Sequence, residues 1–336
     1  MIIMKLLVTG GLGFIGSNFI RLMLKEHPDW SILNVDALKY GSNPDNLSGL
    51  DEAGKYAFMN GDIADPALVS SLVKKADAVV SFAAETHVDR SISRPDSFLQ
   101  SNVHGVFNIL EALRMHNSKA RFVQISTDEV YGDILQGTFT EESTLRPSSP
   151  YSASKAAGDV FVLAYARTFG LNAMITRCTN NYGPRQFPEK LIPKTVLRAV
   201  QSLKIPVYGT GNNVRDWIYV DDHCRAVSLV LERGRAGEVY NISAGEEKTN
   251  LIIVKTILKS LGKDEDMIEF VEDRPGHDAR YSLDSSKIRR ELGWRPLQDF
   301  HEGIKKTVDW YLKNESWWMP LIDDKVLHPT PWKLNW

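Results

Sequence analysis

Short apolar runs alternate with longer amphipathic stretches over the first half of the chain. Runs rich in Val, Ile, Leu and aromatic residues predict strands at residues 5–9, 32–36, 56–60, 78–82, 121–126 and 173–177. Helical periodicity predicts helices in the gaps, at about residues 14–25, 66–74, 95–116 and 150–169. Because strands that alternate with helices form βαβ units, the pattern predicts an α/β fold with a doubly wound parallel sheet.

The pattern changes after residue 177, where a loop rich in proline is followed by shorter elements. These are predicted as helices at about residues 191–202 and 251–261 and as strands near residues 215–220 and 238–242. We therefore expect a larger domain over residues 1–177, with a returning segment around residues 212–243. A smaller, mixed α/β substrate domain over residues 178–336 is expected to be interleaved with it.

Composition narrows the class of protein. The net charge of −2 provides no excess of positive charge for nucleic acid or an anionic membrane. The two cysteines cannot form a disulfide framework, and no cluster has the spacing of a zinc site, so we expect a cytoplasmic protein without a metal. The first ten residues, starting at Met1 or Met4, are too short to span a membrane and lack the features of a signal peptide. Tryptophans near the C-terminal end are expected to pack at the domain edge: Trp310, Trp317, Trp318, Trp332 and Trp336.

A glycine pattern connects the first predicted strand to the first predicted helix. Gly10, Gly13 and Gly16 have the spacing that permits a tight turn, close approach of a pyrophosphate and close packing of the helix. The first helical turn, which contains Phe14 and Ile15, would offer unpaired N–H groups to the phosphates. A simple glycine turn is the alternative, but the flanking strand and helix favour a Rossmann dinucleotide site in the larger domain.

Asp36 ends the second predicted strand, 20 residues after Gly16. A carboxylate at this position can accept hydrogen bonds from both ribose hydroxyls and repels a 2′-phosphate, which favours NAD over NADP. Lys39 complicates this prediction, because a cation could tolerate the phosphate. Asp62, just after the third strand, is placed to reach the adenine, although a simple turn aspartate explains its spacing equally well.

Tyr151 and Lys155 stand one turn apart on one face of a predicted helix. A phenol ordinarily ionises near pH 10. We expect the neighbouring ammonium and a positive nicotinamide ring to lower the pKa of Tyr151. The pair would then remove a hydroxyl proton while a hydride leaves for NAD.

Ser126, Thr127, Asp128 and Glu129 follow the fifth predicted strand at its carboxyl end, the edge where open α/β sheets bind ligands. Both carboxyl groups can face one cleft only if the strand has ended before them, and a solvated acidic turn is the alternative. A dehydration gives each carboxyl a task. Once C4 of a hexose is a ketone, a carboxylate can remove the C5 proton while a carboxylic acid protonates the departing C6 hydroxyl.

These residues together resemble the extended short-chain dehydrogenases, and more narrowly the dTDP-glucose 4,6-dehydratase family. The resemblance covers nearly the whole chain. It is carried by the motifs named above and by further motifs at residues 83–91, 177–184, 187–193, 215–220, 273–277 and 291–294. Departures include Lys39 and Ser101, each at a position where threonine is more usual.

The resemblance implies roles for individual residues. Asp128 matches the family's acid, Glu129 its base, Tyr151 and Lys155 the pair for the initial oxidation, and Thr127 a contact to the sugar hydroxyl. It implies NAD contacts at Gly10, Gly13, Phe14, Ile15, Gly16, Asp36, Asp62, Ile63, Ala83, Ala84, Ser101, Ser126, Tyr151, Lys155 and Asn181. It implies nucleotide-sugar contacts at Thr86, Thr127, Asn180, Lys190, Leu191, Pro206, Tyr208, Arg215, Asn250, Arg274 and His277.

The resemblance implies a cycle of C4 oxidation, C5/C6 elimination and return of the hydride to C6, with dTDP-glucose as substrate and NAD regenerated in each turnover. A UDP-sugar 4-epimerase and a UDP-glucuronate decarboxylase would share the glycine loop, Tyr151 and Lys155, and a non-catalytic NAD sensor is a third alternative. The apolar stripes of the helices at about residues 95–116 and 150–169 predict a homodimer, although they could simply cover the sheet.

Overall fold

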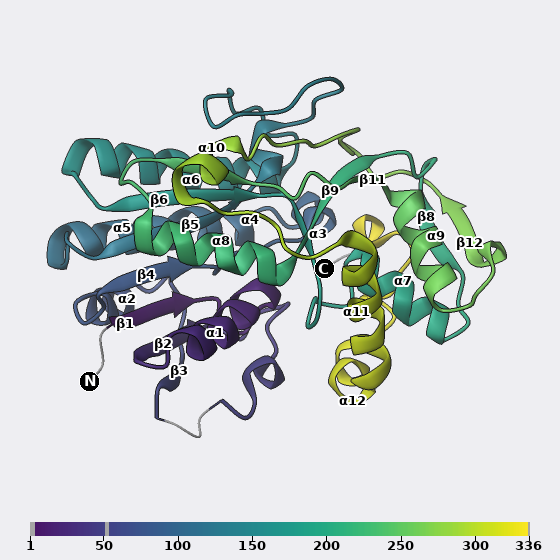
Figure 1. Ribbon diagram of the computed structural model, residues 1–336, viewed down its shortest axis with the longest axis horizontal. Coiled ribbons are helices and arrows are strands. Elements are labelled where there is room, and N and C mark those ends of the chain that lie inside the picture. The colour runs from purple at the N-terminus through teal and green to yellow at the C-terminus, as the bar shows by residue number, and fades with distance from the viewer. Residues whose placement is uncertain (1–3, 51–53, 335–336) are drawn as a thin grey trace.

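The computed structural model describes residues 4–50 and 54–334, so that Met1 and Trp336 lie outside the described residues. The chain builds a large sheet covered by helices on both faces and, beside it, a smaller group of strands and helices (Figure 1). Within the described residues, no helix combines the length and the apolar character needed to cross a membrane.

The large sheet has seven strands in the order β10-β6-β5-β4-β1-β2-β3, and every neighbouring pair is parallel. Its strands are β1 (Met4–Thr9), β2 (Trp30–Asp36), β3 (Tyr56–Asn60), β4 (Ala78–Ser81), β5 (Arg121–Thr127), β6 (Ala173–Cys178) and β10 (Val239–Ile242). The predicted doubly wound parallel sheet is therefore confirmed. The strand order reverses between β1 and β4, and such a switch point opens a crevice at the carboxyl ends of the strands.

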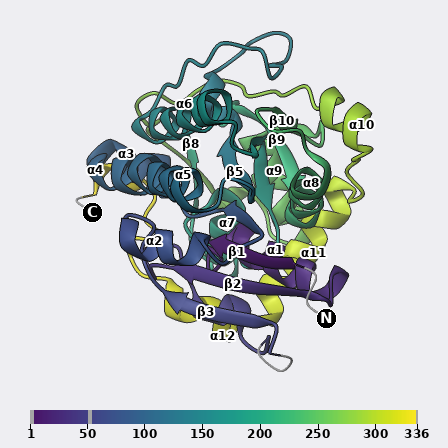
Figure 2. The same cartoon turned by 90° about the vertical axis from the view of Figure 1, so that its left-hand side faces the viewer.

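Helices on the two faces of this sheet form two separate apolar cores. One face packs against α1 (Phe14–Glu26), α8 (Val220–Arg233) and α10 (Ser286–Leu292). The other face packs against α2 (Pro66–Val73), α5 (Gly105–His116) and α6 (Pro150–Phe169). Figures 1 and 2 show the two sets of helices on opposite sides of the sheet.

The helix expected over residues 95–116 is interrupted. It consists of α4 (Asp96–Leu99), a π-helical turn (Gln100–His104) and α5. Asn102 in the π turn accepts a hydrogen bond from the Glu85 backbone N–H and donates to the Glu85 carbonyl and the Ser154 hydroxyl. The wider turn therefore places a polar side chain where it joins the loop after β4 to α6. Such π turns are frequent at functional sites.

The smaller group of elements contains two short sheets. They are formed by β7 (Asn180–Tyr182), β9 (Val214–Tyr219) and β11 (Glu247–Thr249), and by β8 (Ile205–Tyr208) and β12 (Ile268–Val271). The helices α7 (Leu191–Val200), α9 (Asn250–Ser260), α11 (Phe300–Lys313) and α12 (Glu315–Trp318) enclose a third apolar core. Trp317 and Trp318 are buried in this core, as expected for packing residues.

Candidate active site

The turn between β1 and α1 has room for backbone but not for side chains. Gly10 has a φ of +72°, and a Cβ at this residue would lie 2.4 Å from the backbone nitrogen of Ala83. A Cβ on Gly16 would lie 2.5 Å from the carbonyl oxygen of Gly10. The first turn of α1 can therefore approach the loop this closely only because residue 16 is glycine. The turn therefore brings the helix N-terminus to the crevice, as a bound pyrophosphate requires.

The carboxylate of Asp36 lies at the end of β2, where the ribose of a dinucleotide would lie. It accepts hydrogen bonds from the backbone N–H groups of Leu12 at 3.0 Å and Leu38 at 2.9 Å and from the Ser42 hydroxyl at 2.7 Å. Three donors hold this carboxylate in place, and it has no cationic partner among the described residues, so it can repel a 2′-phosphate, which fits NAD.

Lys39 points to a different carboxylate. Its Nζ atom lies 2.7 Å from Oδ2 of Asp62. Burial pushes the pKa of Asp62 upward, but the hydrogen bonds from Lys39 and the Ala64 backbone outweigh this and lower it. The lysine that complicated the choice of cofactor is therefore engaged with Asp62 and does not pair with Asp36.

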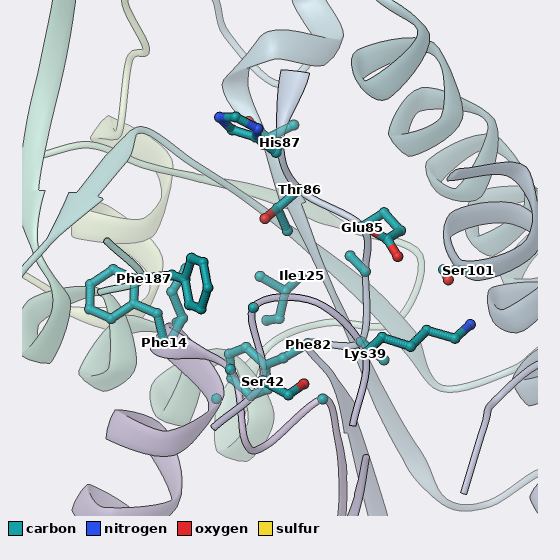
Figure 3. A pocket seen from close by; sticks show the side chains of 18 of the residues that line it. Phe14, Lys39, Ser42, Phe82, Glu85, Thr86, His87, Ser101, Ile125 and Phe187 are labelled. Carbon is teal, nitrogen blue, oxygen red and sulfur yellow. The ribbon is translucent and has the colours of Figure 1, made fainter. Parts of the chain in front are cut away.

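A first pocket runs along the carboxyl ends of the strands. Figure 3 shows Phe14 and Phe187 on one side of it and Lys39 and Ser101 on the other. All residues for which the resemblance implies NAD contacts line it, from the glycine loop to Lys155 and Asn181. The sequence reasoning missed other lining residues, including Tyr40, Ser42, Phe82, Cys178 and Phe187. Their residue types carry no distinctive signal, because aromatic, hydroxyl and thiol side chains at strand ends and in loops occur in any α/β protein.

Tyr151 and Lys155 both lie in this pocket, in the first turns of α6. Ser149 and Ser152 form a capping box that fixes where the helix begins. The ammonium of Lys155 donates to the carbonyl of Ile125 at 2.6 Å, and burial lowers its pKa. In the protein without its cofactor, burial and the nearby Glu129 raise the pKa of Tyr151, whereas the predicted lowering of this pKa includes the positive charge of a nicotinamide ring. In the protein alone, the phenol is therefore held protonated.

Asp128 and Glu129 follow the end of β5 in a 3₁₀ turn, η4 (Asp128–Tyr131). The strand has ended before them, which is the condition for both to face one cleft. Asp128 is buried, and burial together with Glu129 raises its pKa to about 8. Its Oδ2 atom has no hydrogen-bond partner among the described residues. A carboxyl group with these properties is protonated at neutral pH and has a proton to donate.

Glu129 lies among cations. Burial raises its pKa, while Arg274, Arg215 and Lys190 act in the opposite direction. These three side chains line a second pocket that meets the first at Glu129 and at Thr86, His87, Asn180, Glu189 and Lys190. Two neighbouring carboxyls with unlike surroundings can act as an acid and a base on one ligand.

The second pocket brings the remaining candidates together. Residues of the predicted nucleotide-sugar set that line it are Thr86, Asn180, Lys190, Leu191, Pro206, Tyr208, Arg215, Asn250, Arg274 and His277, and Thr127 lines the first pocket. Arg274 forms an ion pair with Asp89 at 2.7 Å, and Arg215 stacks over the Tyr281 ring at 4.2 Å. Guanidinium groups fixed in this way suit a diphosphate.

The sequence reasoning assigned no role to several residues in this second pocket. His87, Asp89, Glu189, Lys194 and Tyr281 all line it. The available signal was position, because His87 and Asp89 stand within the motif at residues 83–91 and Glu189 immediately precedes Lys190.

The chain has clear relatives among known proteins. The family model described as GDP-mannose 4,6 dehydratase matches residues 7–307. A dTDP-glucose 4,6-dehydratase of Streptomyces niveus is 52% identical over 322 residues, which are 95% of this chain and 96% of the relative. The crystal structure of DesIV, a dTDP-glucose 4,6-dehydratase from Streptomyces venezuelae with NAD and TYD bound, has a TM-score of 0.92 at 49% identity and covers 95% of this chain and 100% of its own.

Epimerases are more distant. The UDP-glucose 4-epimerase of Thermotoga maritima, crystallised with UDP-glucose, is 29% identical with a TM-score of 0.86, covering 93% of this chain and 100% of the epimerase. The family match over most of the chain and the identity of about half to the dehydratases lead to one conclusion. The chain belongs to the sugar-nucleotide 4,6-dehydratase family, within the extended short-chain dehydrogenases.

Proposed function

We propose that this protein catalyses the NAD-dependent 4,6-dehydration of dTDP-glucose to dTDP-4-keto-6-deoxyglucose and water. The observation that carries the proposal is the pair Asp128 and Glu129, an acid and a base side by side at the end of β5. A 4-epimerase or a decarboxylase needs no such pair for its chemistry. The relatives that are about half identical to this chain are named dTDP-glucose 4,6-dehydratase, which supports the same substrate.

NAD is the cofactor, and when bound it accepts the C4 hydride of the sugar and later returns it to C6. Tyr151 receives the proton of the C4 hydroxyl as the hydride leaves. Thr127 lies beside it, and its hydrogen bond acts to lower the pKa of the Tyr151 phenol. Burial and Glu129 hold this phenol protonated in the protein alone, so the positive charge of the oxidised cofactor is needed before Tyr151 can act as a base.

The elimination falls to the carboxyl pair. Glu129 removes the C5 proton, whose acidity comes from the new C4 ketone. Asp128 donates its proton to the C6 oxygen, which leaves as water, and the C5–C6 double bond forms. Return of the hydride to C6 and of a proton from Glu129 to C5 gives the product. The proton that Tyr151 gained at C4 equals the one that Asp128 lost at C6, so release of the first to water and uptake of the second from water restore both groups and complete the balance. Removing either carboxyl function would reduce the rate by about 10² to 10⁴, the usual contribution of a positioned acid or base.

The nucleotide diphosphate fits the second pocket. Arg215, Arg274 and Lys190 bring positive charge to its lining. The same cations act to lower the pKa of Glu129 and so favour the base in its charged form. The same three cations therefore bind the diphosphate and favour the charged form of Glu129.

Transfer of deuterium within the sugar tests the proposal. The protein is incubated with dTDP-glucose deuterated at C4, and the product is examined by NMR and mass spectrometry. We expect deuterium at C6 of a 4-keto-6-deoxy sugar, because the hydride that leaves C4 is the one that returns. Unchanged substrate, or its C4 epimer, would contradict the proposed dehydratase activity, and the epimer would establish a 4-epimerase instead.

We also propose that the protein is cytoplasmic. Cys178 and Cys224 are free thiols, and both are buried. Free thiols in the core are typical of a reducing compartment.

We further propose a homodimer formed through α5 and α6. Phe107 on α5 and Phe161 on α6 are each 37% exposed, and their rings meet edge to face at 6.0 Å. Val160 is also exposed on α6, and Leu99 is exposed at the end of α4, which precedes α5 along the chain. Large apolar side chains in one exposed patch favour an interface with a second copy of the chain.

A further inference from the structure

The chain does not end at α12 but turns back across the molecule. Residues 323–334, which we call the C-terminal strap, lead to a short 3₁₀ turn, η7 (Pro331–Lys333), that packs against α3 (Val88–Ser93). Figures 1 and 2 show where α12 and α3 lie, and the strap runs between these two helices. Val326, Leu327 and Trp332 are buried, so the strap is packed against the protein rather than lying loosely on its surface.

The strap makes polar contacts with the walls of the second pocket. Lys194, which lines the pocket from α7, donates from Nζ to the carbonyl of His328 at 3.2 Å. Lys333 forms an ion pair with Glu272, which stands two residues before Arg274. A backbone oxygen of the strap thus binds a lysine in one wall of the pocket, and Lys333 contacts the segment that leads to Arg274.

Trp332 begins a line of contacts that ends at a pocket cation. Its ring meets the ring of Tyr208 nearly edge to face, with centroids 4.7 Å apart. The Tyr208 hydroxyl donates to Oδ2 of Asp89 at 3.3 Å, and Oδ1 of Asp89 lies 2.7 Å from Nη1 of Arg274. Tyr208, Asp89 and Arg274 all line the second pocket, whereas Trp332 stands behind them.

We propose that the C-terminal strap holds the nucleotide-diphosphate pocket in its binding geometry, with Trp332 as the positioning residue that acts through Tyr208 on Asp89 and Arg274. The inference rests on the proposed function only in taking a nucleoside diphosphate as the occupant of this pocket. Its physical basis is that a cation binds a diphosphate well only when its own position is fixed in advance. Asp89 fixes one nitrogen of Arg274, and Tyr208 fixes Asp89, so the position of the Tyr208 ring matters to both.

The test compares substitutions of Trp332 in the full-length holoenzyme. The dissociation constant of dTDP is measured by calorimetry, KM and kcat by turnover of dTDP-glucose, and bound NAD by its absorbance after release. We expect W332A to raise Kd and KM about tenfold while kcat stays within about twofold and the NAD content is unchanged. W332F keeps an aromatic edge for Tyr208 and should return Kd to within about threefold of the wild type.

Trp310 provides a matched control, because its ring packs on Tyr311 and Trp317, neither of which lines the pocket. W310A should bind dTDP as the wild type does. A wild-type Kd in W332A would overturn the proposal, as would equal losses of binding, kcat and NAD in W332A and W310A. If W332A does not fold, W332L takes its place, and the same outcomes apply.

Wild-type protein that binds UDP but not dTDP would contradict the proposed substrate. The same comparison of variants, made with UDP, would then test the strap alone.

Discussion

Asp128 and Glu129 are adjacent in the sequence, yet different groups surround their side chains. Asp128 is buried beside a second carboxyl, and both effects raise its pKa, to about 8. For Glu129 the effect of burial is opposed by Arg274, Arg215 and Lys190. Burial raises the pKa of both carboxyls, but only Glu129 has three cations that act against this rise. Unlike surroundings of this kind allow two like residues to take opposite roles.

The raised pKa of Asp128 predicts how activity depends on pH. The acid is active only while protonated, so kcat/KM, which reports the free enzyme, should fall as the pH rises through about 8. Replacing Asp128 with Asn should lower kcat by about 10² to 10⁴ and remove that falling limb. The measurement is initial rate against pH from neutral to alkaline buffers. A limb near pH 8 that persists in D128N would assign it to another group.

Residue identity and spacing predicted which side chains meet at the site, but not their state. Tyr151 and Lys155 were expected to interact as phenol and ammonium because they stand one helical turn apart. The structure gives Lys155 a different partner, the Ile125 carbonyl, and gives Tyr151 a raised pKa. Both results depend on how deeply β5 and α6 bury these groups, and no local pattern in the sequence encodes that depth.

At the scale of elements, the π turn at Gln100–His104 is the feature that periodicity could not reveal. A π turn contains one more residue than an α-helical turn, so it shifts the apolar stripe by one position. The apolar pattern on each side of the turn is still helical, and periodicity therefore predicts one continuous helix. Gly158 on α6 allows the close approach, since a Cβ there would lie 2.8 Å from the carbonyl of Asn102. The π turn, the loop after β4 and α6 are thereby joined beside Ser101, which lines the first pocket.

Substitution of Asn102 by alanine tests this junction. The variant leaves the N–H and C=O of Glu85 without their partner in a buried site, so we expect a loss of about 3 kcal/mol in the free energy of unfolding. Urea denaturation followed by circular dichroism gives the value. As a control, S93A removes a hydroxyl that bonds an exposed carbonyl of its own helix, and should change stability by less than about 0.5 kcal/mol. Equal effects in the two variants would show that Asn102 is not a structural link.

The larger sheet was predictable strand by strand, and the predictions of α7, α9 and β9 are also confirmed, whereas the other short strands of the smaller part were not predicted. Each strand from β1 to β6 is an apolar run with its own turn signals, and all of them were expected. In contrast, β8 pairs with β12 across more than fifty residues of chain, and β7 and β11 are three residues each. Strands this short are stabilised by distant partners, so their own sequences carry little signal.

The whole molecule places its chemistry where distant segments of the chain meet. Asp128 and Tyr151 come from the large sheet and α6, while Arg215 comes from β9 and Arg274 from the loop after β12. The C-terminal strap then crosses back to α3. Such crossings are properties of the folded chain as a whole. The tryptophans near the C-terminal end predicted that this segment packs on the protein, but they did not predict which elements it contacts.

The exposed apolar face of α5 and α6 predicts the assembly. Replacing Phe107 and Phe161 together with aspartate puts two charges into the proposed interface, so the variant should elute as a monomer while the wild type elutes as a dimer. Leu110 also lies on α5, but it is fully buried in the core of its own chain, and a charge there would unfold the protein rather than test the interface. L312D on α11 is the control, because Leu312 is 50% exposed on a helix outside the proposed interface, and it should leave the dimer intact. Size exclusion with light scattering gives the mass of each variant, and a dimeric F107D/F161D protein would place the interface elsewhere.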